Sequence, residues 1–208
     1  AIEKCQEIAS KWLAELDLEL KPSKTRITHT LNKIEENQEP GFDFVGFNIR
    51  SFPVGKSNCG KNNGVKTGFK TLVRPAADKV KTHYRNLADK ITQCRSATQD
   101  ELISQLIPII TGWCNYYASA CSKEAFVELD HKLFWKLFRG WGKFRHPKKS
   151  GKWIARKYWY IQKHKNWTFG NDHLVLPKHS NTKITRHTKV KGESSPYDGN
   201  WTYWSKRK

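Results

Sequence analysis

The sequence predicts an α+β fold in which a helix and a β-hairpin precede a three-helix bundle and a basic, irregular C-terminal tail. Three observations lead to this prediction. Short alternating runs bounded by Pro and Gly lie before residue 74, apolar residues recur every three or four positions up to residue 144, and Lys, His, Trp and Tyr then replace the aliphatic residues. We therefore divide the chain into residues 1–73, 74–144 and 145–208.

Residues 1–73 predict one amphipathic helix and a few short strands. An apolar stripe at helical spacing opens the chain, and Pro22 lies just past it, where a helix cannot continue. Gly46 falls inside a strand-like run and indicates a bulge. A stretch rich in Gly, Asn and Lys predicts a mobile basic loop. The predicted elements are a helix at 1–17, strands at 25–31, 42–49 and 69–73, and the loop at 53–68, which carries Lys56, Lys61 and Lys66.

Residues 74–144 predict three helices that bury one another's apolar stripes, because each stripe repeats at three- and four-residue spacing. The first helix follows Pro75 and ends near Cys94. The second opens with Thr98 and Glu101, whose spacing is that of a capping box. The third begins after Ser122 and continues to about residue 144.

The tail predicts a short helix and brief strands. Ser150 is a suitable N-cap for a helix ending near Ile161. Residues 178–196 are polar and basic, and we expect part of the tail to be disordered without a ligand. The strand-like pieces are Trp167–Phe169, Leu174–Leu176 and Trp201–Trp204.

The charge balance indicates a polyanionic partner. The chain has 38 Lys and Arg residues against 19 Asp and Glu, which gives a net charge of +19. Phosphate backbones are the usual partner of such an excess, because each neutralised phosphate releases counterions. Aromatic residues interleave with the cations and can stack on unpaired bases, so we expect structured RNA. A basic surface that is merely solvated is the alternative.

Other function classes find less support. No apolar run is long enough to cross a membrane. Five widely spaced cysteines without a CxxC pair favour a reducing, intracellular compartment over secretion. Scattered carboxylates and the absence of a phosphate-binding loop lead us to predict no catalytic residue, and the clustered His173, His179 and His187 do not predict a metal site. Because the sequence lacks Met and opens inside a helix, we expect a longer parent protein.

The densest basic segment is residues 143–159, where eight of seventeen residues are Lys, Arg or His. A charge run is often only a solvated face. Here Trp153, Tyr158 and Trp159 interrupt the run, which solvation does not require. We therefore predict nucleic-acid contact at this segment, with cations on phosphates and aromatic rings stacking or packing.

Four sequence blocks share the order and spacing of one protein family. They are Leu20–Thr25 with Phe42–Phe47; Arg74-Pro75 and Leu106-Ile107; Gly112–Tyr117 and Phe126 with Leu129-Asp130; and Arg145–Ser150 with Trp153-Ile154 and Lys157–Trp159. Together they resemble the C-terminal part of a group II intron-encoded reverse transcriptase/maturase. The three predicted domains correspond to the end of its palm, its thumb or maturase X domain, and the start of its DNA-binding region.

The resemblance implies that the chain binds group II intron RNA and assists its folding and splicing, and that the tail contacts target DNA. The family's catalytic Asp-Asp box does not occur in these 208 residues. RNA-directed DNA polymerase activity and intron mobility are therefore implied only for a parent protein. Mg²⁺ is expected for that polymerase and for the intron RNA, with no cofactor in this chain. The implied location is the bacterial cytoplasm or an organelle, and a nonspecific DNA-binding module is the alternative function.

The residues expected to contact nucleic acid are mostly basic. The predicted RNA or DNA contacts are Lys79, Lys81, Arg85, Arg139, Lys143, Arg145, His146, Lys148, Lys149, Lys152, Arg156 and Lys157. Asn115, Tyr116, Trp153 and Tyr158 are predicted to stack or to make polar contacts.

Overall fold

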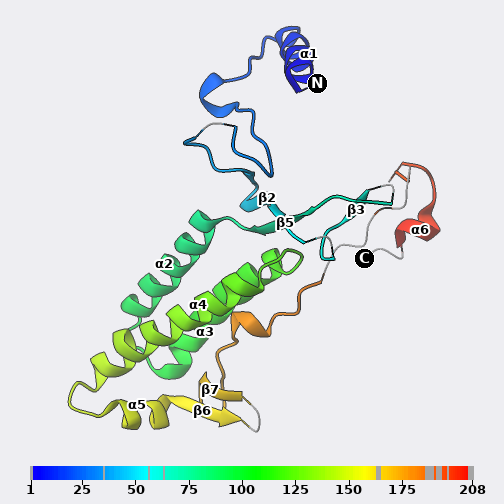
Figure 1. Cartoon of the computed structure of the whole chain (residues 1–208). Coiled ribbons are helices and arrows are strands. Elements are labelled where there is room, and N and C mark those ends of the chain that lie inside the picture. Colours follow the sequence, from blue (N-terminus) through cyan, green and yellow to red (C-terminus); the bar gives the residue numbers. More distant parts are fainter. Residues whose placement is uncertain are drawn as a thin grey trace. The chain divides into compact units, whose positions relative to one another are not determined.

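The computed structural model describes residues 2–34, 36–55, 57–62, 64–162, 165–185, 190, 194–195 and 197–205. The chain divides into two compact units, residues 1–73 and 74–208, which combine helices with small antiparallel sheets (Figure 1). The predicted α+β class is therefore confirmed. Lys56, on the predicted basic loop, lies outside the described residues.

Unit 1–73 begins with helix α1 (Ile2–Ala14) and a 3-10 turn, η1 (Pro22–Lys24). The strand predicted at residues 25–31 is not formed, so that prediction was wrong. The imidazole Nδ1 of His29 accepts hydrogen bonds from the backbone amides of Leu31 (3.1 Å) and Asn32 (2.9 Å), which turns the chain. Such local side-chain bonds to the backbone compete with a strand ladder.

The run predicted as one strand at residues 42–49 folds instead as a hairpin of β1 (Phe42–Phe44) and β2 (Phe47–Pro53). Val45 and Gly46 form the two-residue turn, with φ values of 47° and 79°. Positive φ at both central positions is the geometry that joins twisted strands most readily, so Gly46 serves a turn and not a bulge.

The remaining strands of this unit follow the hairpin. The return strand predicted at 69–73 is confirmed as β5 (Phe69–Pro75), and the sheet order is β1-β2-β5. Within the predicted basic loop, β3 (Lys61–Asn62) pairs with β4 (Val65–Lys66). Part of that loop is therefore regular structure, with Lys61 and Lys66 exposed on it.

Unit 74–208 contains the predicted helical bundle. Its helices are α2 (Ala77–Gln93), α3 (Gln99–Tyr117) and α4 (Lys123–Trp135), and α4 continues as a π-helix, η2 (Lys136–Lys143). The capping box of α3 forms as predicted, since Thr98 and Glu101 each bond the other's backbone amide. These bonds also lower the pKa of Glu101. The fully buried core includes Leu87, Ile91, Leu102, Leu106, Phe126, Leu129, Leu137 and Trp141.

Residues after the bundle are more regular than predicted. The side chain of Ser150 accepts a hydrogen bond from the amide of Trp153 and caps α5 (Gly151–Tyr158), as predicted. The helix ends at Tyr158 and not near Ile161, because β6 (Trp159–Gln162) turns back to pair with β7 (Lys165–Phe169). Gly142 permits α5 to approach η2, since a Cβ there would lie 2.8 Å from Ile154 Cγ2.

Three further predictions for the tail have different outcomes. Leu174–Leu176 forms only an isolated bridge between Gly170 and Val175. The strand predicted at 201–204 is a short helix, α6 (Trp201–Ser205), because the Asn200 side chain caps the amide of Tyr203 (3.1 Å). Of the residues predicted to be disordered, 178–185 are ordered and contain η3 (His179–Asn181), whereas most of 186–196 lies outside the described residues.

Trp141 joins the bundle to the tail. It is fully buried, its indole Nε1 donates to the Cys94 carbonyl (3.0 Å), and its ring packs against Tyr158 and Phe169. These contacts connect η2 with the end of α2, with α5 and with β7. Trp141 therefore helps to fix the position of the basic segment relative to the bundle.

Replacing Trp141 with Ala is expected to lower the free energy of unfolding by about 3–5 kcal/mol, because it empties a buried site and removes the donor to Cys94. Denaturant titration of the purified chain measures the loss. Trp201→Ala removes a Trp that is 77% exposed and is the matched control, with an expected change under ~0.5 kcal/mol. Equal losses in both variants would contradict this role for Trp141.

Candidate nucleic-acid interface

An uninterrupted stretch of positive charge follows Asp130. No Asp or Glu occurs between Asp130 and Asp172, whereas this interval holds twelve Lys and Arg residues. Among its described side chains, only Lys132 forms an ion pair, with Glu128 on the preceding turn. The cations from Lys136 to Lys157 therefore have no carboxylate partner within the described part of the chain, and their charge is available to an external anion.

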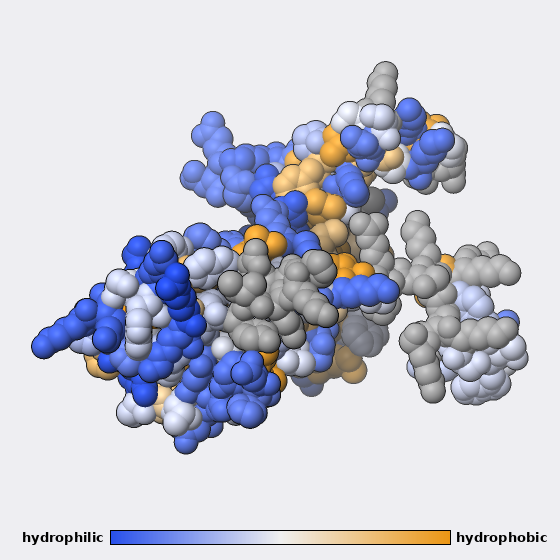
Figure 2. Space-filling model, turned by 90° about the horizontal axis from the view of Figure 1, so that it is seen from below, coloured by the Kyte–Doolittle hydropathy of each residue, from blue (hydrophilic) through white to orange (hydrophobic). Residues whose placement is uncertain are grey.

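The fold presents these cations on η2, on the turn after it and on α5. Hydrophilic residues cover most of this end of the unit in the view of Figure 2. Lys143 Nζ donates to the Lys149 carbonyl (2.6 Å), which ties the end of η2 to the turn. We define the η2–α5 surface as the exposed cations Arg139, Lys143, Lys148, Lys149, Lys152, Arg156 and Lys157.

Trp153 lies within the η2–α5 surface between two lysines. The Lys149 and Lys157 ammonium groups lie 5.4 Å and 5.0 Å from the centre of its ring. His146 packs edge-to-face against the same ring, at 4.9 Å. Cation–π contacts of this kind hold the lysine side chains in place without neutralising them. The ring of Trp153, which is half-buried, thus orders the cations around it.

His146 reports the local electrostatic potential. Its Nε2 is 2.6 Å from the Tyr158 hydroxyl. Burial and the nearby charges of Lys157, Arg145 and Lys149, in that order, lower the pKa of His146 below its usual 6.5. At neutral pH the imidazole is therefore neutral, in surroundings that already carry excess positive charge.

Two predicted contact residues have structural roles instead. The guanidinium of Arg145 is half-buried and donates to the carbonyls of Arg95 (2.8 Å) and Ala97 (2.9 Å), while lying over the Trp141 ring. Tyr158 is 6% exposed, so its ring cannot stack on a base. The prediction that Tyr158 contacts nucleic acid is therefore corrected, and Arg145 is assigned chiefly to the packing of η2 against α2.

The other predicted contacts lie elsewhere on the same unit. Lys79 and Lys81 are exposed near the start of α2 and Arg85 at its middle, whereas the η2–α5 surface adjoins the end of α2 through Trp141 and Cys94. Asn115 and Tyr116 are exposed on α3. The structure thus brings the cations of residues 139–157 together and leaves those of α2 as a separate group.

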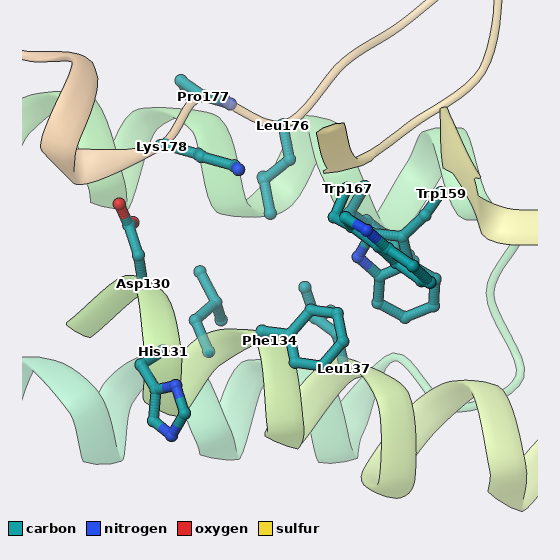
Figure 3. Close-up of a pocket in the computed structure, with 11 residues that line it drawn as sticks. Asp130, His131, Phe134, Leu137, Trp159, Trp167, Leu176, Pro177 and Lys178 are labelled. Carbon is teal, nitrogen blue, oxygen red and sulfur yellow. The ribbon is translucent and has the colours of Figure 1, made fainter. Parts of the chain in front are cut away.

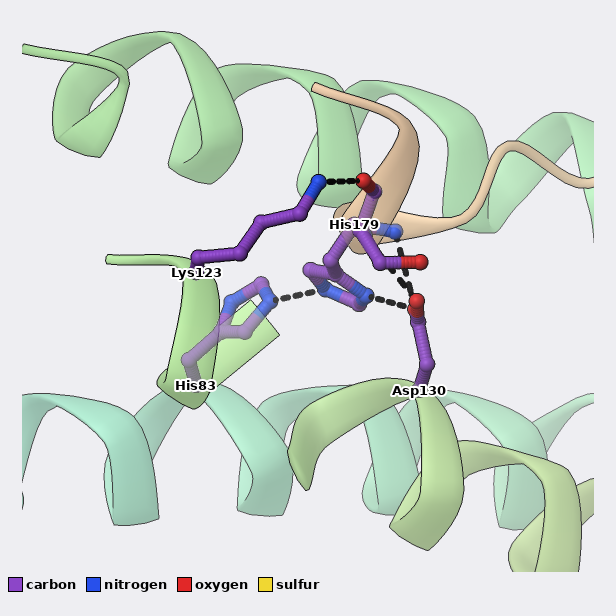
Figure 4. Close-up of polar contacts among 5 residues, drawn as sticks. His83, Lys123, Asp130 and His179 are labelled. Carbon is purple, nitrogen blue, oxygen red and sulfur yellow. Dashed lines mark hydrogen bonds and ion pairs between the residues drawn. The ribbon is translucent and has the colours of Figure 1, made fainter. Parts of the chain in front are cut away.

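A buried polar chain links the tail to the bundle (Figure 4). The Asp130 carboxylate on α4 accepts hydrogen bonds from His179 Nδ1 and from the amides of His179 and Ser180, at 2.8–2.9 Å. His179 Nε2 is 3.0 Å from His83 Nε2 on α2, and Lys123 donates to the Ser180 carbonyl. Burial raises the pKa of Asp130, but the bonds from His179 and Ser180 outweigh it and lower the pKa overall.

Sequence reasoning missed this chain of contacts. The sequence groups His179 only with His173 and His187, and His187 lies outside the described residues. His83 and His179 are separated by 95 intervening residues, so no local spacing could connect them. Among the described residues, no group of three or more His, Cys, Asp or Glu is placed to hold a metal ion.

An apolar hollow lies beside the Asp130–His179 contact (Figure 3). Phe134 of α4, Trp159 of β6 and Trp167 of β7 line it, and Leu176 closes one side. None of the predicted contact residues lines the hollow. It lies between the bundle and the tail, and its lining is mostly apolar, with Asp130, His131 and Lys178 at its edge.

Comparison with known proteins places the interface in a family. Residues 80–159 match the family described as "Group II intron, maturase-specific domain". The match runs from α2 to the first residue of β6 and includes every predicted contact residue except Lys79. No curated protein matches the chain. The resemblance inferred from the sequence is therefore confirmed for residues 80–159. Within the described residues, no helix has the length and apolarity needed to cross a membrane.

The pH dependence of stability tests the buried chain. Burial and the neighbouring His179 lower the pKa of His83 from 6.5 to about 3. Between these values the unfolded chain binds a proton that the folded chain does not, so stability should fall as the pH drops, by at most about 1.4 kcal/mol per pH unit. Denaturant titrations between about pH 7 and about pH 5 measure this slope.

His83→Gln is the comparison variant, because it removes the titrating group. Its unfolding free energy should depend less steeply on pH over the same range. If the variant and the parent chain keep the same slope, His83 is not the group responsible.

Proposed function

We propose that this chain binds group II intron RNA through the η2–α5 surface and thereby assists the folding and splicing of the intron. The observation that carries the proposal is the set of cations without carboxylate partners, held in place on the part of the chain that matches the maturase-specific family. We also propose that the chain belongs to a longer reverse transcriptase. In that protein, the tail contacts the target DNA.

The physical basis is charge compensation. A structured intron brings phosphates close together, and their repulsion opposes folding. A rigid cationic surface lowers that cost and releases counterions as it binds. The protein then stabilises the active RNA fold while the RNA performs the chemistry. Lysines ordered around Trp153 lose less side-chain entropy on binding than free lysines do.

Replacing four lysines with Ala tests the proposal. Lys148, Lys149, Lys152 and Lys157 are exposed, and removing them spares the structural Arg145. Affinity for the intron RNA should fall by orders of magnitude. The salt dependence, as the slope of log K against log salt, should weaken by roughly 3, because each lost phosphate contact removes about 0.7–0.9. The variant should also lose the ability to stimulate splicing of that intron.

The matched control removes the same charge elsewhere. Lys4, Lys21, Lys24 and Lys70 are exposed in the first unit and form no ion pair among the described residues, so their replacement by Ala gives the same net charge. If control and test variants lose equal affinity, binding is a general attraction to polyanions. Equal affinity of the parent chain for duplex DNA and intron RNA in matched salt would favour the nonspecific DNA-binding alternative.

A further inference from the structure

A solvent-open groove runs between α2 and α3, away from the η2–α5 surface. Lys79, Thr82 and Asn86 line it from α2, and Gly112 and Tyr116 line it from α3. All five residues are exposed. The proposed function above does not use this groove, although two of the predicted contact residues, Lys79 and Tyr116, lie in it.

Gly112 has no structural explanation within the chain. It lies inside the 19-residue helix α3, where glycine destabilises a helix relative to alanine. Its φ is not positive, and a Cβ built on it meets no atom within 4 Å. Alanine would therefore fit this position and favour the helix. A glycine that packing does not require leaves the helix backbone open to close approach by a ligand.

The groove presents the aromatic, hydrogen-bonding and cationic side chains that can bind a nucleotide. The Tyr116 ring lines the groove, is 49% exposed and packs edge-to-face on Tyr117 at 4.8 Å. Among the described residues, the side chains of Thr82 and Asn86 form no hydrogen bond. Lys79 stands at one end, 3.3 Å from the carboxylate of its neighbour Asp78. A paired cation makes this groove less suited to several phosphates than the η2–α5 surface.

The floor of the groove is rigid. The imidazole of His83 stacks on Trp113 with ring centres 4.5 Å apart and an interplanar angle of 12°. Its Nε2 is fixed by His179, which Asp130 holds in turn. A ligand would therefore bind to a preformed surface, and little conformational entropy of the protein would be lost on binding.

We propose that this groove binds a single unpaired nucleobase of the RNA. The base stacks on Tyr116, its polar edge bonds to Asn86 and Thr82, the ribose passes over Gly112, and one phosphate reaches Lys79. Unpaired bases are bound in this way by an aromatic face together with hydrogen-bonding side chains. The inference rests on the proposed function, because it assigns a second site on the same RNA-binding protein.

Filling the groove tests this assignment. Gly112→Leu places a side chain of a good helix former into the open space, so the melting temperature should stay equal or rise. Gly112→Ala adds only a methyl group, so it is the graded comparison, and Tyr116→Phe, which keeps the aromatic ring, is the matched control. The probe is a mixed-sequence single-stranded RNA of about 12 nucleotides, and the corresponding duplex is the comparison. The affinity of the full-length protein chain is measured for both.

For Gly112→Leu and for Tyr116→Ala, affinity for the single strand should fall roughly tenfold, the loss typical of one stacked base. Tyr116→Phe should bind it like the parent chain, Gly112→Ala should lose less affinity than Gly112→Leu, and duplex affinity should not change. Unchanged single-strand affinity in Gly112→Leu would overturn the groove assignment and leave the η2–α5 surface standing. An equal loss for single strand and duplex would overturn the assignment to an unpaired base. Failure of the proposed function would appear separately, because the four-lysine variant would then bind intron RNA with the same affinity as the parent chain.

Discussion

The burial of Trp141 is the contact on which the rest of the interface depends. Its indole bonds the end of α2, its ring supports Tyr158 and Phe169, and the Arg145 guanidinium covers it. The π-helical continuation of α4 brings Trp141 to this position. Because α5 and the β6–β7 hairpin are anchored here, the lysines of η2, of the turn after it and of α5 are displayed on a rigid support and do not form a free tail.

A second anchor acts at the other end of the same helices. The carboxylate of Asp130 organises η3, and His179 passes the contact to His83 on α2. The two anchors support different surfaces of the same unit. One holds a surface with uncompensated positive charge, and the other stiffens the groove beside Gly112. In the two proposals, long-range attraction to phosphate and short-range recognition of a base are thus separated along α2.

The sequence predictions that are confirmed rest on patterns within a few neighbouring residues. The Thr98–Glu101 box, the Ser150 cap and the helical stripes are each encoded within a few residues, and all three formed. Predictions failed where turn chemistry decided the outcome, as at His29, at Val45-Gly46 and at Asn200. For the candidate site, the charge run indicated where cations gather. The internal roles of Arg145 and Tyr158, and the contact of His83 with His179, depend on tertiary packing that no local pattern encodes.

The most direct test of the account is the pKa of His146, followed by nuclear magnetic resonance in the free chain and in its complex with intron RNA. Burial and the surrounding cations hold this pKa below 6.5 in the free protein. Phosphates bound to Lys149 and Lys157 would offset that positive potential, so the account predicts that the pKa rises on binding. An unchanged pKa in a saturated complex would place the RNA elsewhere and contradict the central claim.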